Sequence, residues 1–275
     1  MQGVPLVSII TVSFNSEKYI AETIESVLKQ EYTNIEYVII DGGSNDNTLA
    51  IIKKYEPQFK GRMKWISEPD KGIYDAMNKG ISKSSGSIIG LLNSDDYLTK
   101  DSIRKVVNIY NTNNDKEYFV ISGLMSRVDL NGNTIYVKKH HSYQKFSQLI
   151  KQATPISHPA LFVPKVVYEK YGYFDTSLKI LADYEFILRI FYSGVDFILA
   201  DEVITHFREG GISDKNIMRR TLESYKARKK YMSTSLNIKQ TLKFLVTRVK
   251  GKISTMLPSS VIKSFYNYKY GGKNN

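Results

Sequence analysis

The first half of the chain alternates strand-like and helix-like segments, and this alternation narrows the possible folds more than any other feature. Four apolar runs are typical of buried strands: Leu6–Val12, Ile35–Ile40, Met63–Ser67 and Ile88–Leu92. Three segments between them space apolar residues as helices do: Ser16–Lys29, Thr48–Tyr55 and Ile73–Ile81. This order predicts an α/β fold, with a mostly parallel sheet and helices on both faces. Ser16 is the expected N-cap of the first helix.

The middle of the chain is less regular. Tyr118–Val128 and Thr134–Lys138 are predicted strands, joined around Asn131-Gly132-Asn133, which is typical of hairpin turns. Ala160–Val163 is a further predicted strand, and Tyr184–Tyr192 is a predicted helix. There is no internal repeat or low-complexity tract, so we expect one large domain, with or without an appendage.

The composition excludes several classes of protein. With 275 residues, 42% of them hydrophobic, the chain can bury a sizeable core and is not generally disordered. It has no cysteine, which rules out disulfides and fits a reducing compartment. No apolar run reaches the roughly 18 residues that a spanning helix needs. Met1–Pro5 leads into a strand without the pattern of a secretory signal, so we expect a cytoplasmic protein.

The net charge of +12 is concentrated at one end of the chain. Residues 214–275 hold 15 Lys and Arg residues against two acidic residues, Asp214 and Glu223, whereas residues 1–213 are close to neutral. A break in charge of this kind predicts a boundary between two parts of a protein. We therefore expect a domain at 1–213 and a basic, mainly helical tail at 214–275.

The tail contains a predicted amphipathic helix, Ile238–Met256, with apolar residues on one face and most lysines elsewhere. Such a helix favours attachment to an anionic membrane surface, where each basic residue contributes about 1 kcal/mol. A second segment, Val261–Tyr270, adds aromatic residues that suit the headgroup region. A helical hairpin that packs on the domain remains the alternative.

Polar and glycine-rich segments follow the four predicted parallel strands. They are Ser13-Phe14-Asn15, Asp41-Gly42-Gly43-Ser44-Asn45-Asp46, Glu68-Pro69-Asp70-Lys71-Gly72 and Asn93-Ser94-Asp95-Asp96. Ligands of such sheets bind beyond the carboxyl ends of the strands, so we expect these segments to converge on one site. Each segment alone also has an ordinary interpretation, with Phe14 in the core, the glycines in a turn and Asp46 capping a helix.

Two adjacent carboxylates, Asp95 and Asp96, stand at the mouth of the fourth predicted strand. Like charges in a partly desolvated site repel each other, and a cation beside them removes the repulsion. Mg²⁺ and Mn²⁺ are held by one or two carboxylates together with substrate phosphates. The pair therefore predicts a metal–diphosphate site, with a solvated turn that caps the next helix as the alternative.

Four ordered segments resemble the motifs of family 2 glycosyltransferases. They are Val7–Asn15, Ile39–Thr48, Asp70–Ile81 and Leu91–Asp96, and the resemblance covers roughly residues 5–212. One such motif is a weak signal, whereas four in this order and spacing are specific. The resemblance implies a GT-A fold, a nucleotide-diphosphate-sugar donor, Mn²⁺ or Mg²⁺ as cofactor, and inversion at the anomeric carbon.

The resemblance also assigns roles to residues of the donor site. Phe14 matches the aromatic residue that stacks near the base, Asp41 the acid that contacts the base or ribose, and Asp95 and Asp96 the metal-binding carboxylates. The other residues expected at the donor are Ser13, Asn15, Gly43, Lys71, Asn93 and Ser94.

The chain departs from the family pattern at three positions. Val12 stands where Pro or Thr is common, and Gly42 stands where many members have a second Asp. Asn93 replaces the first acid of the metal motif. The last departure leaves Asp95 as the expected direct ligand, with Asp96 in support.

An inverting displacement needs a base for the attacking acceptor hydroxyl, and a carboxylate can take that proton. Asp183 matches the family's catalytic base at the head of a helix, with Ala182 in place of the preceding acid; helix capping is the alternative. We consider His206 as a metal ligand, and His158 and Arg189 as contacts to the acceptor or diphosphate. Each of these three also has a structural interpretation.

The sequence thus predicts transfer of one sugar, from a UDP-sugar or similar donor, to a lipid-linked or growing surface glycan of the bacterial kind. The expected location is the inner face of the cell membrane. A sugar-1-phosphate nucleotidyltransferase is an alternative, although Ser13–Ser16 does not form the glycine-rich, lysine-containing phosphate loop of such enzymes. A non-catalytic, membrane-tethered assembly factor is another. No base-reading motif appears, so we expect no nucleic-acid partner.

Overall fold

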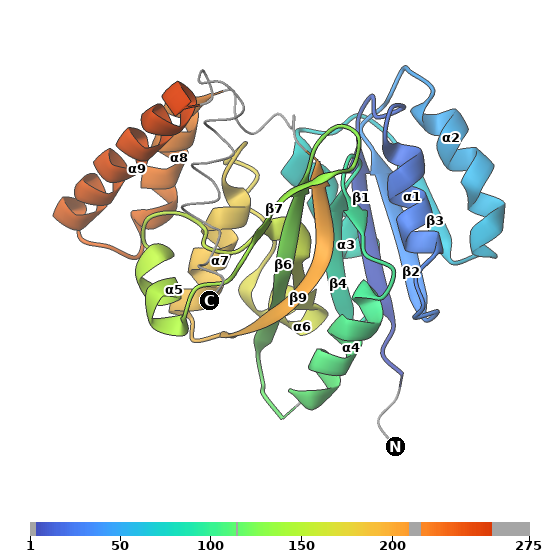
Figure 1. Cartoon of the computed structure of the whole chain (residues 1–275), viewed down its shortest axis with the longest axis horizontal. Helices are drawn as coiled ribbons and strands as arrows, with labels where there is room; N and C mark the ends of the chain where they lie inside the picture. The colour runs from blue at the N-terminus through green and yellow to red at the C-terminus, as the bar shows by residue number, and fades with distance from the viewer. Residues whose placement is uncertain (1–3, 114, 209–215, 255–275) are drawn as a thin grey trace.

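The computed structural model describes residues 4–113, 115–208 and 216–254, with the backbone alone for 248–254. This part of the chain forms a nine-stranded sheet in the order β3-β2-β1-β4-β8-β6-β9-β5, with β7 paired to β6 (Figure 1). The strands are β1 Val7–Ser13, β2 Ile35–Asp41, β3 Met63–Ser67, β4 Ile88–Asn93, β5 Tyr97–Leu98, β6 Phe119–Val128, β7 Thr134–Lys138, β8 Leu161–Pro164 and β9 Asp196–Arg208. The α/β fold predicted from the sequence is confirmed, and the sheet as a whole contains both parallel and antiparallel pairs.

The first four strands pair in parallel with one another, and β1 lies between β2 and β4. The chain first builds outward from β1 through β2 to β3, then returns to add β4 on the other side of β1. Such a reversal leaves a crevice at the carboxyl ends of the two central strands, where ligands of α/β sheets bind. Ser13 lies beside Asp41 in the register, and Asp41 lies beside Ser67.

Helices cover both faces of the sheet because successive residues of a buried strand point to opposite sides. In β1, Val7 and Ile9 pack with one set of helices, whereas Ile10 and Val12 pack with the other. The first set is α1 Ile20–Leu28, α2 Thr48–Tyr55 and α4 Ser102–Thr112. The second set is α3 Ile73–Lys83, α5 Tyr143–Leu149, α6 Lys165–Tyr171 and α7 Ala182–Tyr192. Two short 3₁₀ helices, Glu56–Phe59 and His158–Ala160, complete the domain.

The beginning of α1 differs from the prediction. The helix begins at Ile20, with Tyr19 at the N-cap position, so Ser16 does not cap it. The Ser16 hydroxyl instead lies 2.8 Å from the hydroxyl of Ser94, beyond the end of β4. Asp46 does support a helix start, because its Oδ1 accepts a hydrogen bond of 3.0 Å from the amide of Thr48.

The last two described helices form a hairpin at the opposite end of the molecule from α1 and α2 (Figure 1). They are α8 Ile217–Arg228 and α9 Thr234–Ser254, and α8 contacts both α7 and α9. Phe244 is buried in this hairpin, as is Arg228, whose guanidinium bonds to Asn237 and Thr241 of α9. This is the packed hairpin that the sequence left as an alternative. The predicted segment Val261–Tyr270 lies outside the described residues.

Candidate functional site

The carboxyl ends of the parallel strands are linked by side-chain hydrogen bonds, as the sequence predicts. Ser13 Oγ donates to Asp41 at 3.0 Å and Ser67 Oγ donates to it at 2.8 Å, which joins β1, β2 and β3. The contact between Ser16 and Ser94 joins the loops after β1 and β4. The four segments therefore converge at the crevice between the central strands.

Asp41 is fully buried at the centre of this network. Its Oδ2 accepts hydrogen bonds from the amides of Gly43 (3.1 Å) and Ser44 (2.8 Å) and from the Ser67 hydroxyl, and its Oδ1 accepts from the Ser13 hydroxyl. Burial by itself would raise the pKa of Asp41, but these hydrogen bonds lower it below its ordinary value. Gly43 needs its φ of 84° to turn the loop around the carboxylate. The Asp41 carboxylate is thus occupied in shaping the loop.

Phe14 is exposed rather than part of the core, with 64% of its surface accessible. It stands near Gly42 and Asp70: a Cβ atom on Gly42 would lie 3.4 Å from the Phe14 ring and 2.5 Å from Asp70 Oδ2. The absent side chain at 42 therefore lets the half-buried Asp70 approach the ring. Asn15, next along the chain, has a φ of 49°, a conformation that Asn tolerates better than most residues.

Asp70 is a candidate that sequence reasoning missed. The sequence placed it in a motif, but its closeness to Phe14 depends on the fold and on Gly42. Its Oδ1 accepts a hydrogen bond of 2.7 Å from the amide of Gly72, which fixes the side chain in the loop after β3. A planar ring beside a carboxylate can stack on a nucleobase and accept hydrogen bonds from its N–H groups or from ribose hydroxyls.

Asp95 and Asp96 differ sharply in their surroundings. Asp96 is fully buried, and its Oδ1 and Oδ2 accept hydrogen bonds from the Arg208 amide (3.1 Å) and Asn93 Nδ2 (2.8 Å). Asp95 is half-buried, and within the described residues no other residue donates a hydrogen bond to its carboxylate. Burial raises the pKa of Asp95, and burial together with the neighbouring Asp95 charge raises that of Asp96 well above the ordinary value.

The role of Asn93 follows from this geometry. Its amide donates to the buried carboxylate of Asp96, whereas an acid at position 93 would place a like charge there. Asn93 is therefore part of the support of Asp96. The turn is also tied to α1, since the Thr23 hydroxyl lies 2.7 Å from the Asp96 carbonyl oxygen and 3.0 Å from that of Ser94.

Arg208 is the second candidate that the sequence did not indicate. Its guanidinium is buried at the end of β9 and donates to the carbonyl oxygens of Asp95 (3.3 Å) and Leu130 (3.1 Å). It also pairs with Glu22. The positive charge opposes the rise in the pKa of both Asp95 and Asp96. An isolated Arg at a strand end carries no sequence signal, because its partners come from distant segments.

The described residues contain no group of three or more His, Asp or Glu side chains placed to hold a metal ion. His206 stacks on Tyr97 with ring centroids 4.7 Å apart, and its buried Nδ1 has no hydrogen-bond partner in the described part of the chain. A half-buried carboxylate without a donor fits a divalent cation that shares its ligands with a diphosphate. The fit therefore rests on Asp95, while Asp96 is already satisfied by the protein.

Asp183 is the second residue of α7 and faces α3. Its Oδ1 lies 2.9 Å from the hydroxyl of Tyr74, which also lies 2.8 Å from the carbonyl oxygen of Ile180. Burial raises the pKa of Tyr74, and the negative charge of Asp183 raises it further. His158 packs against Phe174; burial lowers the pKa of His158, and the Asp183 charge opposes that change.

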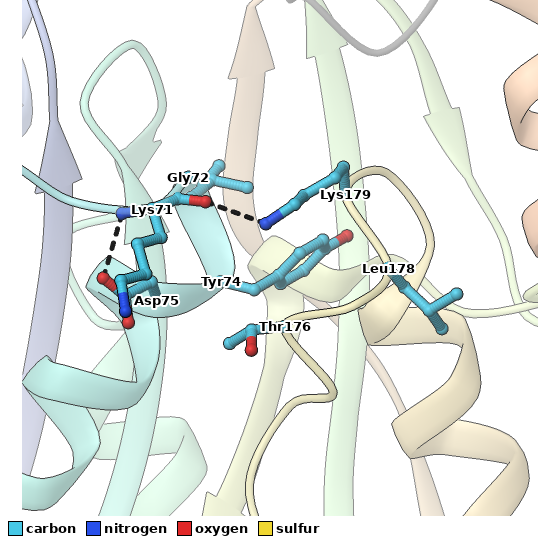
Figure 2. Close-up of a pocket in the computed structure, with 8 residues that line it drawn as sticks. Lys71, Gly72, Tyr74, Asp75, Thr176, Leu178 and Lys179 are labelled. Atoms are coloured by element: carbon cyan, nitrogen blue, oxygen red, sulfur yellow. Dashed lines mark hydrogen bonds between the residues drawn. The ribbon is translucent and has the colours of Figure 1, made fainter.

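Lys71 lines a small cavity, and Arg189 is held by hydrogen bonds and an ion pair within the protein. Figure 2 shows Lys71 beside Tyr74 and Lys179, around a cavity of about 10 Å³ that has room for a single water molecule. Arg189 donates to the carbonyl oxygens of Tyr171 (2.6 Å) and Tyr173 (2.7 Å) and pairs with Glu185. These contacts favour the packing alternative for Arg189.

Residues 8–170 match the family described as Glycosyl transferase family 2. An uncharacterized glycosyltransferase of Mycobacterium tuberculosis strain H37Rv is 36% identical over 191 residues, which cover 69% of this chain and 70% of the relative. The family match covers the strands from β1 to β8, apart from Val7, together with the loops that follow the parallel strands and the turn that carries Asp95.

Two solved structures have the same fold. S. aureus TarS 1-349 in complex with UDP-GlcNAc aligns with a TM-score of 0.65 and 19% identity, over 87% of this chain and 71% of that chain. In a longer TarS structure the alignment spans 42% of the TarS chain. The mannosyltransferase PcManGT from Pyrobaculum calidifontis, in complex with GDP-Man and Mn²⁺, aligns with a TM-score of 0.64 and 16% identity, over 99% of this chain and 82% of that chain.

Proposed function

The chain belongs to glycosyl transferase family 2 and is a glycosyltransferase, and from this premise we propose that it uses a nucleotide-diphosphate-sugar donor. It transfers one sugar, with inversion, to a hydroxyl of a lipid-linked or growing surface glycan. The observation that carries the donor class is the exposed Phe14 ring beyond the end of β1, with Asp70 beside it. The solved relatives hold UDP-GlcNAc or GDP-Man, and a UDP-sugar is the donor that we propose here.

The donor nucleoside lies against Phe14 in this proposal. Asp70 accepts hydrogen bonds from the base or ribose, and the buried Asp41 holds the Gly43 loop that borders the same space. Ser13, Asn15, Asn93 and Ser94 act on the donor through the shape of these loops, because their polar atoms bond to neighbouring segments.

The donor diphosphate lies by Asp95, together with Mn²⁺ or Mg²⁺. The cation would offset the negative charge of the diphosphate and of Asp95, and so favour departure of the nucleotide. Asp96 and Arg208 fix the turn after β4 through the hydrogen bond that the Arg208 amide donates to Asp96. His206 is a further candidate ligand on β9, opposite Tyr97 in the sheet, since its Nδ1 has no hydrogen-bond partner among the described residues.

The acceptor hydroxyl loses its proton to Asp183. Tyr74 holds one carboxylate oxygen by a hydrogen bond, and in this proposal the other oxygen receives the proton. His158 lies close enough for its titration to respond to the Asp183 charge, and we assign it to the acceptor side of the site. Lys71, on the same side, is available to an anionic part of the substrate.

The C-terminal hairpin provides a surface for an anionic membrane in this proposal. The outer stripe of α9, defined as Ile238, Leu242 and Val246, is about half exposed at each residue, at 48%, 58% and 52%. Lys239 and Lys243 stand beside it and are exposed as well. Apolar residues flanked by lysines fit the boundary between anionic headgroups and acyl chains. Of the described helices, none is long and apolar enough to span a bilayer.

The direct test is a donor screen, followed by an activity measurement. A nucleotide sugar that binds the folded chain raises its melting temperature by mass action, so the donor can be identified by the rise in melting temperature. With that donor, transfer or hydrolysis should require Mn²⁺ or Mg²⁺ and fall steeply in Asp95→Ala and Asp183→Ala. Unchanged activity in either variant would remove the role assigned to that residue.

A further inference from the structure

Glu223 is the only acidic residue in 215–275, and its side chain points into the domain rather than to solvent. It lies on α8 and is 5% exposed. Its carboxylate accepts hydrogen bonds from three successive backbone amides, those of Lys179 (3.0 Å), Ile180 (2.8 Å) and Leu181 (3.0 Å). Arg219, one turn earlier on α8, donates to the same carboxylate at 3.0 Å.

The three amides form the segment that leads directly into α7. Leu181 is the N-cap residue of this helix, and Asp183 follows two positions later. The side chain of Lys179 is tied across to the carbonyl oxygen of Lys71 at 2.9 Å, which Figure 2 shows. Glu223 therefore fixes the backbone immediately before the proposed base.

Ile180 is held on both of its backbone polar groups. Its amide donates to Glu223 of α8, and its carbonyl oxygen lies 2.8 Å from the Tyr74 hydroxyl of α3. The same hydroxyl contacts Asp183. The segment before Asp183 is thus fixed between two helices that lie far apart in the sequence.

The contact requires a charged carboxylate. Burial by itself would raise the pKa of Glu223, but the amide hydrogen bonds and Arg219 lower it, so the group is ionised at neutral pH. A carboxylate can accept from all three amides at once, whereas a Gln side chain has one acceptor oxygen and would turn an N–H group toward an N–H group. Hydrogen bonds to a charged group are stronger than those between neutral groups.

We propose that Glu223 is a positioning residue for Asp183, so that the C-terminal hairpin sets the geometry of proton removal from the acceptor. The inference rests on the proposed role of Asp183 as the base. Glu223 does not touch the substrate; it acts by holding the Lys179–Leu181 backbone. Displacement of a catalytic group by about 1 Å lowers the rate by roughly 100-fold, which sets the scale of the effect.

The test is Glu223→Gln in the full chain, with transfer measured under donor saturation. We expect kcat per folded molecule to fall about 10- to 100-fold, while the KM for the donor stays within about twofold. We expect kcat to change and the donor KM to stay nearly constant because the proposed donor residues, Phe14 and Asp95, lie on other loops. Glu202→Gln is the matched control, since Glu202 is an exposed carboxylate paired with Lys105, and it should leave kcat unchanged.

A second variant decides the matter if Glu223→Gln does not fold. Glu223→Asp keeps the charge but is shorter by one methylene, so it reaches fewer of the amides, and we expect an intermediate loss of kcat. If a folded Glu223→Gln or Glu223→Asp variant keeps the wild-type kcat while Asp183→Asn is inactive, the role of Glu223 is wrong and the role of Asp183 as the base still stands. Full activity in Asp183→Asn would overturn the role of the base, and the inference with it.

Discussion

Tyr74 and Asp183 lie 109 residues apart in the chain, yet the Tyr74 hydroxyl lies 2.9 Å from Asp183 Oδ1. The contact joins the motif that begins at Asp70 to the proposed base at the head of α7. It also explains why a tyrosine is buried at the first turn of α3, with its hydroxyl shared between a carboxylate and the Ile180 carbonyl oxygen. The orientation of the proposed base therefore depends on a residue of α3.

Tyr74→Phe should lower kcat about tenfold without changing the KM for the donor, because the Asp183 carboxylate loses the bond that orients it. The free energy of unfolding should fall by about 1–3 kcal/mol, since the Ile180 carbonyl oxygen loses a partner. Steady-state kinetics and urea unfolding check the two effects. An unchanged kcat would show that Asp183 does not need this bond.

Asp95→Asn and Asp96→Asn should separate activity from stability. Asp95→Asn removes the one carboxylate of the pair that has no donor, so activity should fall at least about 100-fold with little change in melting temperature. Asp96→Asn turns an amide group toward Asn93, so the free energy of unfolding should fall by about 1–3 kcal/mol. Thermal unfolding without donor and a transfer assay with Mn²⁺ distinguish them. Equal losses of stability would contradict this division of roles.

Phe14→Ala should raise the KM for the donor about 10- to 100-fold, because stacking of a base on an aromatic ring is worth about 1–3 kcal/mol. The melting temperature of the free protein should barely change, since the ring is 64% exposed. Tyr143→Ala, at an aromatic residue that is 56% exposed on α5, is the control. If both variants bind the donor equally well by thermal shift, Phe14 does not hold the base.

Glu36 should make the stability of the sheet depend on pH. Burial opposes its charge, but hydrogen bonds from Lys64, Ser8 and Ser85 lower the pKa of Glu36 to about 2. A lowered pKa in the folded state stabilises the fold above the ordinary value of 4.5, and this stabilisation is lost as the pH falls toward 2. Glu36→Gln should therefore cost about 3 kcal/mol at pH 7 and progressively less below pH 4.5.

Urea unfolding at a series of pH values measures this difference. Glu169→Gln, at an exposed carboxylate on α6, should show no such dependence. A cost for Glu36→Gln that stays constant down to pH 3 would mean that the charge of Glu36 does not stabilise the fold.

The outer stripe of α9 should carry the attachment to membranes. Replacing Ile238, Leu242 and Val246 together by Ser should weaken binding to anionic vesicles about 10- to 100-fold, because three apolar side chains no longer enter the interface. Sedimentation with vesicles of phosphatidylglycerol measures the effect, with neutral vesicles for comparison. Substitution by Ser at three exposed aliphatic residues elsewhere, Val4, Ile135 and Val166, is the matched control.

Point substitutions are preferable here to removal of α9. Phe244 is buried, and Thr241 accepts a hydrogen bond from the buried Arg228, so a truncation before these residues would also disturb α8. Equal vesicle binding by the stripe variant and the wild type would contradict the membrane proposal.

The parallel half of the fold was predictable because its signals are local. β3 and α2 have the bounds expected from sequence, β2 and β4 each extend one residue further at the C-terminal end, and β1 is shifted by one residue at both ends. Their apolar runs and helical spacings act within a few residues of each other. β9 gave no such signal: its apolar pattern is interrupted by Asp201 and Glu202, and its place between β6 and β5 depends on distant partners.

In the candidate site, too, the positions of residues were predictable from local patterns, whereas their contacts with distant segments were not. The sequence placed Phe14, Asp95 and Asp183 at loops and helix starts, but it did not indicate that Asp41 and Asp96 would be enclosed by hydrogen bonds from the protein. Arg208 and Glu223 escaped notice because each acts through backbone groups from segments far away in the chain. A hydrogen bond between a side chain and the backbone of a distant segment produces no periodic pattern in the sequence.

The hydrogen bonds between Glu223 and the segment before α7 have a practical consequence for chimaeric enzymes. A crossover at the charge boundary near residue 213 would join a foreign hairpin to this core and remove the carboxylate that the Lys179–Leu181 amides require. A crossover in the turn between α8 and α9, around Tyr231–Ser233, would exchange the outer stripe and keep Glu223. The unit of recombination in this molecule therefore extends through α8, beyond the point where the charge of the sequence changes.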